Sequence, residues 1–189
     1  IWDICAEGKI FLDAGASTGG FTDCLLQHGA AHVFSVDVGW NQLNYKLRSN
    51  PKVTVMEKTN IMLVDQLDPV PYAAVADLSF RSLTGAANHL LSLTAKPLLV
   101  ALIKPQFETN RELTEFNGVV ESTAVRHAIV KKTLHLLKEE GVAVSRLTAS
   151  PILGRKGNRE YFALLTRPGS TNYPALSPHQ IESCLKLLP

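Results

Sequence analysis

Short apolar runs alternate along this chain with longer segments in which apolar residues recur at helical spacing. Seven of the apolar runs have the length and composition of buried strands. We expect these strands at Lys9–Leu12, His32–Val36, Val53–Met56, Ala73–Ala76, Pro97–Ile103, Gly141–Thr148 and Tyr161–Thr166. Because helical segments separate most of the strands, the pattern predicts an α/β fold with a mostly parallel sheet.

The segments between the strands predict four helices, and a fifth is expected near the C-terminus. Their ranges are Thr18–Gln27, Gln42–Ser49, Arg81–Ser92, Ser122–Glu139 and His179–Leu188. The clearest is Ser122–Glu139, in which we place His127 and His135 on the solvent side. Its apolar stripe, expected to cover the sheet, consists of Val125, Ile129, Leu134, Leu136 and Leu137.

The last two predicted strands are joined by a loop, which indicates an antiparallel hairpin. The pattern therefore predicts a seven-stranded, mostly parallel sheet with the last strand antiparallel and helices on both faces. That arrangement is typical of methyltransferases rather than dehydrogenases. A chain of 189 residues has the size of one domain. We assign residues 1–168 to it and residues 169–189 to a linker and the short final helix.

The turn between the first strand and the first helix, Asp13 to Thr22, is rich in small residues. Its glycines do not have the G-x-G-x-x-G spacing of a dinucleotide site, and the carboxylate of Asp13 would repel a pyrophosphate. Asp37 ends the second strand about 20 residues later, where an acidic side chain can accept both ribose hydroxyls. A cationic nucleoside cofactor fits this site, and we favour S-adenosylmethionine. The alternative is that Asp13 and Asp37 are only solvated residues at strand ends, without a ligand. The expected contacts are Asp13, Gly15, Ala16, Ser17, Thr18, Gly19, Gly20, Asp37, Val38, Asn60 and Asp77.

Three charged residues are expected to meet at the edge of the sheet where the parallel strands end. Asp77 follows the fourth strand, Lys104 follows the fifth, and Glu160 begins the last strand, which runs in the opposite direction. Carboxylates would orient the lysine, and a neighbouring sulfonium cation would disfavour its charged form. Lys104 could then remove a proton from a substrate hydroxyl. The alternative is a structural ion pair of Lys104 with one of the carboxylates.

Composition narrows the range of functions. The net charge of +2 gives no general argument for nucleic-acid binding, so a basic surface must be local. No apolar run approaches the length that spans a bilayer. Three cysteines without a C-x-x-C pair favour a reducing, cytoplasmic compartment and argue against a zinc site, and we expect no metal. The polar segment Phe107–Gly118 is a candidate mobile loop near the site.

Several motifs together resemble the TlyA family, whose members are often labelled hemolysins and are similar to FtsJ-type ribosomal RNA 2′-O-methyltransferases. The motifs that carry this resemblance are Leu12–Asp23, Val36–Gly39 with Gln42 and Leu43, Asp77–Phe80, Ile103–Glu108 and Gly118–Val120. The resemblance implies a Rossmann-like methyltransferase fold, S-adenosylmethionine as methyl donor, ribose of ribosomal RNA (cytidine in the relatives) as acceptor, and a Lys-Asp-Lys-Glu tetrad. Asp77, Lys104 and Glu160 match the last three members of that tetrad.

Nothing in this chain matches the first lysine of the tetrad, and no S4-type RNA-binding domain is visible. The resemblance places both upstream, so we expect them in a longer protein that acts on ribosomal subunits and has no membrane partner. Contacts with RNA phosphates are expected from basic side chains at the site edge, although a solvated surface is the usual place for such residues. These side chains are Arg81, Arg111, Arg155, Lys156 and Arg159.

Two other classes of function stay open at this stage. One is a cytolysin, as the family label suggests, which would need an apolar or strongly amphipathic cationic segment. The other is a cofactor- or RNA-binding module without catalysis. A longer reading frame with the upstream lysine and the S4-like domain would favour the enzyme. A NAD-dependent dehydrogenase is the weakest alternative because of the glycine spacing and Asp13.

Overall fold

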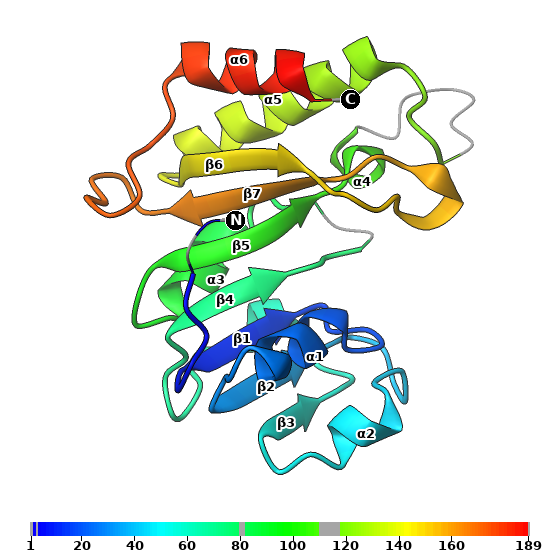
Figure 1. Cartoon of the computed structure of the whole chain (residues 1–189), viewed down its shortest axis with the longest axis vertical. Helices are drawn as coiled ribbons and strands as arrows, with labels where there is room; N and C mark the ends of the chain where they lie inside the picture. The colour runs from blue at the N-terminus through cyan, green and yellow to red at the C-terminus, as the bar shows by residue number, and fades with distance from the viewer. Residues whose placement is uncertain (1, 3, 80–81, 110–117, 189) are drawn as a thin grey trace. The chain divides into compact units, whose positions relative to one another are not determined.

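The computed structural model describes residues 2, 4–79, 82–109 and 118–188, and its strands form one seven-stranded sheet (Figure 1). The strand order is β3-β2-β1-β4-β5-β7-β6. The strands are β1 (Ile10–Ala14), β2 (His32–Val36), β3 (Val53–Met56), β4 (Ala73–Ala76), β5 (Leu98–Ile103), β6 (Ala143–Ala149) and β7 (Tyr161–Thr166). Strands β1 to β4 pair in parallel, whereas β6 and β7 are antiparallel. The predicted sheet, including the hairpin at its end, is therefore confirmed.

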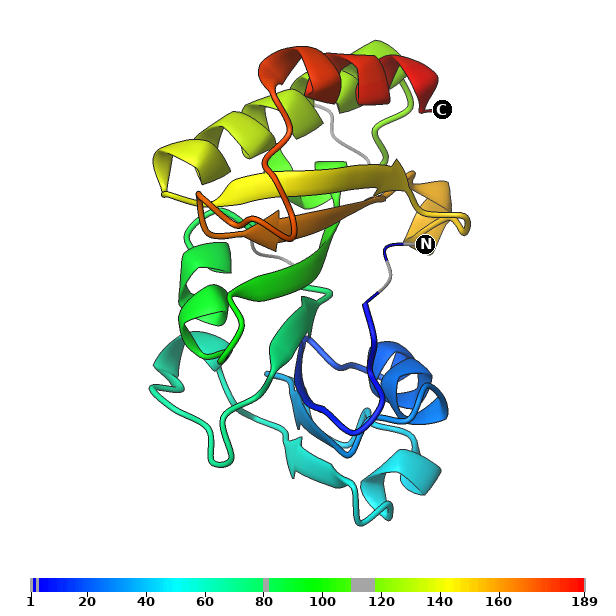
Figure 2. The ribbon, with the colours of Figure 1, turned by 60° about the vertical axis from the view of Figure 1, so that its left-hand side comes forward.

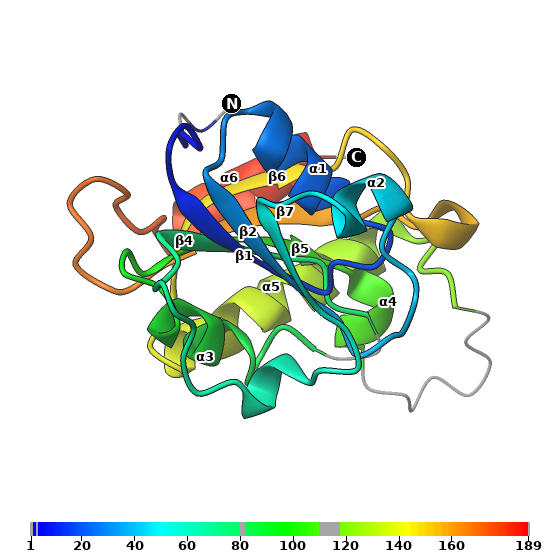
Figure 3. The same ribbon diagram turned by 90° about the horizontal axis from the view of Figure 1, so that it is seen from below.

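The chain divides into two compact units, the first formed by residues 1–78 and 89–99. It contains β1 to β4, α1 (Gly20–Gln27), α2 (Tyr45–Arg48) and the 3-10 turn η1 (Ile61–Leu63). Helix α1 packs on β1 and β2, and α2 packs on β3 (Figure 3). The largest fully buried side chains here include Phe11, Leu12 and Val33, all from the strands. Their burial fixes the strands whose carboxyl ends carry the predicted site.

The second unit comprises residues 79–88 and 100–189. It contains α4 (Pro105–Glu108), α5 (Thr123–Glu139), the 3-10 turn η2 (Arg155–Gly157) and α6 (Pro178–Leu187), together with β6 and β7. Helix α3 (Ala87–Ser92) and β5 are divided between the units. Helices α5 and α6 lie on the β6–β7 hairpin, as Figure 2 shows. Tyr161, Leu137 and Leu164 are fully buried in this unit.

Helix boundaries differ from the predictions where backbone groups have other partners. Helix α1 begins at Gly20 rather than Thr18, because Gly19 takes a left-handed conformation with φ of 100°. Helix α2 begins at Tyr45 rather than Gln42, because the side chain of Asn44 caps it. Helix α3 covers only the end of its predicted range, and α4 was not predicted. Residues 110–117 of the predicted loop lie outside the described residues.

The buried face of α5 differs from the predicted stripe. Its buried residues are Arg126, Val130, Thr133, Leu134 and Leu137. Val125, expected in the stripe, is 45% exposed. His127, expected on the solvent side, is half-buried beside Tyr161, and its burial lowers the pKa of the imidazole. The buried face differs from the predicted one because the guanidinium of Arg126 turns inward, where it donates to the carbonyls of Val120 and Glu121.

The segment that follows β7 is tied to β6. The amide of Leu176 donates to the carbonyl of Val144 at 2.7 Å, and the hydroxyl of Ser145 donates to the carbonyl of Tyr173 at 2.8 Å. Ser177 then caps α6 in a reciprocal arrangement with Gln180. The predicted final helix is present, shifted by one residue toward the N-terminus.

Candidate cofactor and catalytic site

The small-residue turn after β1 closes against the ends of two neighbouring strands. The amides of Gly15 and Ala16 both donate to the carbonyl of Val36, at 2.8 and 3.1 Å. Gly15 has φ of +83°, and a Cβ there would collide with the carbonyl of Asp77. Glycine is therefore required where the turn passes β4. This close approach brings the turn and the ends of β2 and β4 together in the first unit.

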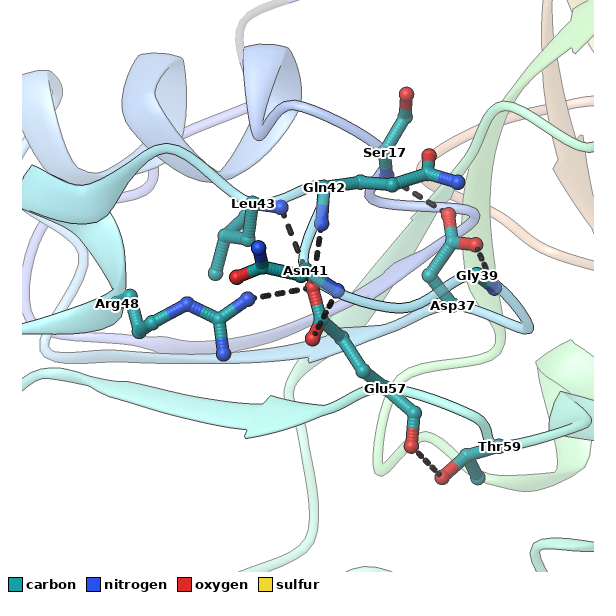
Figure 4. Close-up of polar contacts among 9 residues, drawn as sticks. All are labelled: Ser17, Asp37, Gly39, Asn41, Gln42, Leu43, Arg48, Glu57 and Thr59. Atoms are coloured by element: carbon teal, nitrogen blue, oxygen red, sulfur yellow. Dashed lines mark hydrogen bonds and ion pairs between the residues drawn. The ribbon is translucent and has the colours of Figure 1, made fainter.

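Asp37 links this turn to the loop that follows β2 (Figure 4). One carboxylate oxygen, Oδ2, accepts the amide of Ser17 at 2.8 Å, and Oδ1 accepts the amide of Gly39 at 2.7 Å. The amide of Thr59 donates to the carbonyl of Asp37 at 2.9 Å. The two hydrogen bonds from Ser17 and Gly39 orient the Asp37 carboxylate. Each of its oxygens also keeps a lone pair, so the carboxylate can still accept the hydroxyls of a ribose.

Asp13 lies inside β1 rather than beyond it, paired with Ser35 and Val75 of the neighbouring strands. Its side chain is fully buried, and Oδ2 accepts the hydroxyl of Thr22 from α1 at 2.7 Å. That hydroxyl also lies 2.7 Å from Oγ of Ser35. Burial raises the pKa of the Asp13 carboxyl to about 7. Whether this carboxyl contacts the cofactor, as predicted, stays a prediction.

The other residues of the predicted cofactor site belong to the same unit. Ser17, Thr18 and Gly20 are exposed in the turn, and Val38 is exposed after Asp37. Asn60 caps η1, with Oδ1 accepting the amide of Met62 at 3.1 Å. The set therefore combines an exposed small-residue turn with an acceptor carboxylate at the end of β2, and this donor and acceptor pattern suits a nucleoside.

Lys104 and Glu160 both lie against the short helix α4 in the second unit. Lys104 is the N-cap of α4, is 8% exposed, and donates from Nζ to the hydroxyl of Ser79 at 3.2 Å. Glu160 is 9% exposed, and its Oε1 accepts the side-chain amide of Gln106 at 3.0 Å. A buried lysine and a buried carboxylate are thus gathered at one helix. Asp77 belongs to the first unit, so the convergence of all three stays a prediction.

Sequence reasoning missed three polar residues that organise these surroundings. Gln106 holds Glu160, as described above. Asn158 is buried and joins two segments, because its amide donates to the carbonyl of Gly118 at 2.8 Å and its oxygen accepts the amide of Val120 at 3.2 Å. Glu57, just after β3, accepts several hydrogen bonds from the loop around Asp37 (Figure 4). Amide and carboxylate side chains next to strand ends were the available signal.

The predicted RNA-contacting residues are only partly described. Arg81 and Arg111 lie outside the described residues. The backbone of Arg155 belongs to η2, and Lys156 and Arg159 are exposed in the connection between β6 and β7. These positions suit a surface contact, and their role stays a prediction. Among the described residues, no group of histidine, cysteine or acidic side chains is arranged to hold a metal, and no helix has the length and apolarity to cross a bilayer.

Comparison with known proteins gives a consistent result. The FtsJ-like methyltransferase family matches residues 2–167. "Hemolysin A" of Brachyspira hyodysenteriae is 42% identical over 164 residues, which cover 85% of this chain and 68% of that protein. A 16S/23S rRNA (cytidine-2′-O)-methyltransferase, TlyA, of Mycobacterium tuberculosis is 40% identical over 165 residues, covering 86% of this chain and 62% of that protein.

A solved structure extends the similarity to three dimensions. A protein of Lactococcus lactis labelled a hemolysin aligns with a TM-score of 0.86 at 38% identity. The alignment covers 98% of this chain and 90% of that chain. The chain thus shares its fold with a hemolysin-labelled protein, and it spans about two thirds of the length of the curated relatives given above.

Proposed function

Because this chain belongs to the FtsJ-like methyltransferase family, we propose that it transfers a methyl group from S-adenosylmethionine to a ribose 2′-OH of ribosomal RNA. Family membership confirms the predicted methyltransferase and its cofactor. The acceptor is proposed from the relative named as an rRNA (cytidine-2′-O)-methyltransferase, and cytidine is the favoured nucleoside for the same reason. The reaction would take place on ribosomal subunits in the cytoplasm.

The first unit supplies the groups that would hold the cofactor. Asp37 keeps free lone pairs for the ribose hydroxyls, and the exposed turn of Ser17, Thr18 and Gly20 leaves room for close approach of the nucleoside. When bound, S-adenosylmethionine supplies a methyl group made electrophilic by the sulfonium. No other group is needed to activate the methyl carbon, so the protein's remaining task is to orient the ribose and to remove its proton.

The observation that carries the catalytic proposal is Lys104. Its amine is nearly buried at the N-cap of α4, directly after β5, where side chains of a parallel sheet face a ligand. With the cofactor bound, Lys104 in its neutral form would take the proton from the 2′-OH, so that the ribose oxygen could accept the methyl group that the cofactor supplies. We assign Glu160, held by Gln106, to orienting this amine. The contribution of Asp77 that the sequence predicts stays a prediction.

Replacement of Lys104 tests the proposal. Lys104→Ala should reduce methyl transfer by about 100-fold or more, because the general base is lost, while affinity for S-adenosylhomocysteine stays near that of the wild type. Lys104→Arg should not restore turnover, because a guanidinium stays protonated. The assay follows tritium from labelled cofactor to ribosomal subunits, using this chain joined to the S4-type domain that the resemblance implies. Near-normal turnover of Lys104→Ala would show that the base is elsewhere.

A second candidate function, cytolysis, is favoured only by the name of the Brachyspira relative. It is distinguished from methylation by measuring haemoglobin release from erythrocytes with the wild type and with Lys104→Ala. Lysis that both proteins cause equally would establish an activity independent of methyl transfer. Labelling of ribosomal RNA without lysis would support the methyltransferase alone.

A further inference from the structure

Glu57 follows β3 directly, and the loop after β2 folds around its carboxylate (Figure 4). The same loop begins with Asp37 and Val38, two of the predicted cofactor contacts. Oε2 accepts the amide of Asn41 at 2.8 Å, and Oε1 accepts the amides of Gln42 at 3.0 Å and Leu43 at 3.2 Å. Oε1 also accepts Nη2 of Arg48, from α2, at 2.7 Å. The side chain of Glu57 is only 9% exposed.

Three consecutive backbone N–H groups therefore converge on one carboxylate, in the way that a backbone concavity binds an anion. The conformation depends on Asn41, whose φ of 56° lies in the left-handed region that asparagine tolerates. The Arg48 guanidinium and the loop amides lower the pKa of Glu57 to about 2. Glu57 is consequently an anion throughout the working pH range, and the loop is folded around its charge.

The same loop fixes Asp37. Gly39, whose amide donates to Oδ1 of Asp37, also accepts the amide of Lys58 at its carbonyl, at 2.9 Å. The amide of Thr59 donates to the carbonyl of Asp37. The segments on both sides of Glu57 and of Asp37 are thus hydrogen-bonded to one another. The loop that Glu57 holds at Asn41, Gln42 and Leu43 is therefore continuous with the residue, Gly39, that donates to the Asp37 carboxylate.

The loop also supports the small-residue turn. The amide of Asn44 donates to the carbonyl of Thr18 at 3.1 Å. Leu43 and Leu47 form a buried apolar cluster with Ala16, and a Cβ on Gly19 would collide with both leucines. Residues held by Glu57, directly at Leu43 and through Arg48 of α2, therefore lie against the turn that we expect to contact the cofactor.

We propose that Glu57 is a positioning residue for the nucleoside of the cofactor: it holds the loop at residues 39–43 so that Asp37 and the turn at residues 15–20 are aligned before the ligand arrives. The inference rests on the proposed nucleoside role of Asp37. The inference goes beyond the proposed cofactor contacts because Glu57 does not touch the ligand but acts through Asp37 and the turn. Glu57 thereby has a role in binding and does not only stabilise the fold.

A double-mutant cycle distinguishes positioning from simple stabilisation. Calorimetric titration with S-adenosylhomocysteine compares the wild type with Glu57→Gln, Asp37→Ala and the double variant. Glu57→Gln keeps the size of the side chain but removes its charge, and it should weaken binding about tenfold. If Glu57 acts through Asp37, the double variant should bind about as weakly as Asp37→Ala alone, because residues that act as a unit are not additive.

Three further variants serve as controls. Glu182→Gln makes the same chemical change at an exposed glutamate on α6, 3.7 Å from Lys131, and should leave affinity unchanged. Arg48→Met removes the ion pair but keeps the carboxylate for the loop amides, so its effect should be smaller than that of Glu57→Gln. Glu57→Asp keeps the charge and should recover part of the lost affinity. If Glu57→Gln does not fold, as judged by circular dichroism, Glu57→Asp takes its place in the cycle.

Each outcome decides the inference. Unchanged affinity in Glu57→Gln, effects that simply add in the double variant, or an equal loss in Arg48→Met would overturn it. Failure of the wild type to bind S-adenosylhomocysteine would instead contradict the proposed cofactor. Normal binding by Asp37→Ala would remove the nucleoside role of Asp37. The failure of Glu57 as a positioning residue is therefore separable from failure of the proposed function.

Discussion

Asp13 and Glu57 are carboxylates of the same unit whose surroundings shift their pKa values in opposite directions. Glu57 has an arginine and three loop amides as partners, so its charged form is favoured and its pKa falls to about 2. Asp13 has the hydroxyl of Thr22 but is fully buried, so desolvation dominates and its pKa rises to about 7. At neutral pH Glu57 is thus an anion, whereas Asp13 is near its pKa and is partly protonated.

The pH dependence of stability tests this description of Asp13. Because its pKa is about 7 in the folded protein and 3.8 for an unperturbed aspartate, the folded protein binds the proton more tightly than the unfolded chain. The free energy of unfolding should therefore be higher at low pH and should fall as pH rises toward 7. The decrease should be a few kcal/mol at most. Asp13→Asn should lack this decline. Urea unfolding of both proteins between pH 4 and pH 8 measures the difference, and parallel curves would contradict the raised pKa.

At the scale of elements, α5 shows how one buried cation can redirect a helix face. The guanidinium of Arg126 donates to two carbonyls just before the helix and to the hydroxyl of Thr123. These hydrogen bonds engage both terminal nitrogens of a charged group that burial would otherwise penalise, while Nε is buried without a partner among the described residues. Arg126 then shares the buried face with Val130, Leu134 and Leu137, and Val125 faces solvent. Hydrophobic spacing alone could not predict that an arginine would occupy a core position.

The observed helix face predicts a specific difference between two alanine substitutions. Leu134 is 3% exposed, so Leu134→Ala should destabilise the protein by about 2–5 kcal/mol through lost burial and a cavity. Val125 is 45% exposed, and Val125→Ala should change stability by no more than about 0.5 kcal/mol. Chemical denaturation measures both variants. Comparable losses at the two positions would support the stripe expected from the sequence rather than the observed one.

Elements were predictable to different degrees for physical reasons. Strands β2, β3, β4 and β7 have the expected bounds, because buried apolar runs of this length have few alternatives. Helix starts shifted because of local backbone conformation and capping, as at Gly19 before α1 and at Asn44 before α2, and helical spacing alone does not locate these positions. Asp37 and Lys104 could be chosen from their places at strand ends, whereas Glu57 was missed because its partners lie up to 16 residues away.

At the scale of the whole molecule, charge bears on how RNA would be captured. The chain carries a net charge of only +2, while contacts with phosphates dominate affinity for nucleic acids. The exposed Lys156 and Arg159 offer a local basic surface in the second unit. We therefore expect this chain to bind S-adenosylhomocysteine while binding ribosomal RNA weakly, and we expect an upstream S4-type domain to supply most of the RNA affinity.

Filter binding across a salt series tests this division. A protein that joins the expected S4-type domain to this chain should bind ribosomal RNA more tightly than residues 1–189 and should show a steeper fall in affinity with salt, because more phosphates are neutralised. Changing Lys156 to Ala should weaken binding without altering affinity for S-adenosylhomocysteine. Tight, salt-insensitive binding by residues 1–189 would show instead that this chain carries its own recognition surface.

Local patterns in the chain were enough to predict the α/β order and the small-residue turn after β1, both of which the structure confirms. They also pointed to Asp37 as a ribose acceptor and to Lys104 as a base, and these two roles stay predictions. These predictions depend on periodicity and on the rule that ligands meet the carboxyl ends of parallel strands. Three-dimensional contacts were needed to find that Asp13 is buried, that Gln106 holds Glu160, and that Glu57 organises the loop beside Asp37. The reason is that desolvation and long-range hydrogen bonds depend on residues distant in sequence, which periodicity does not bring together.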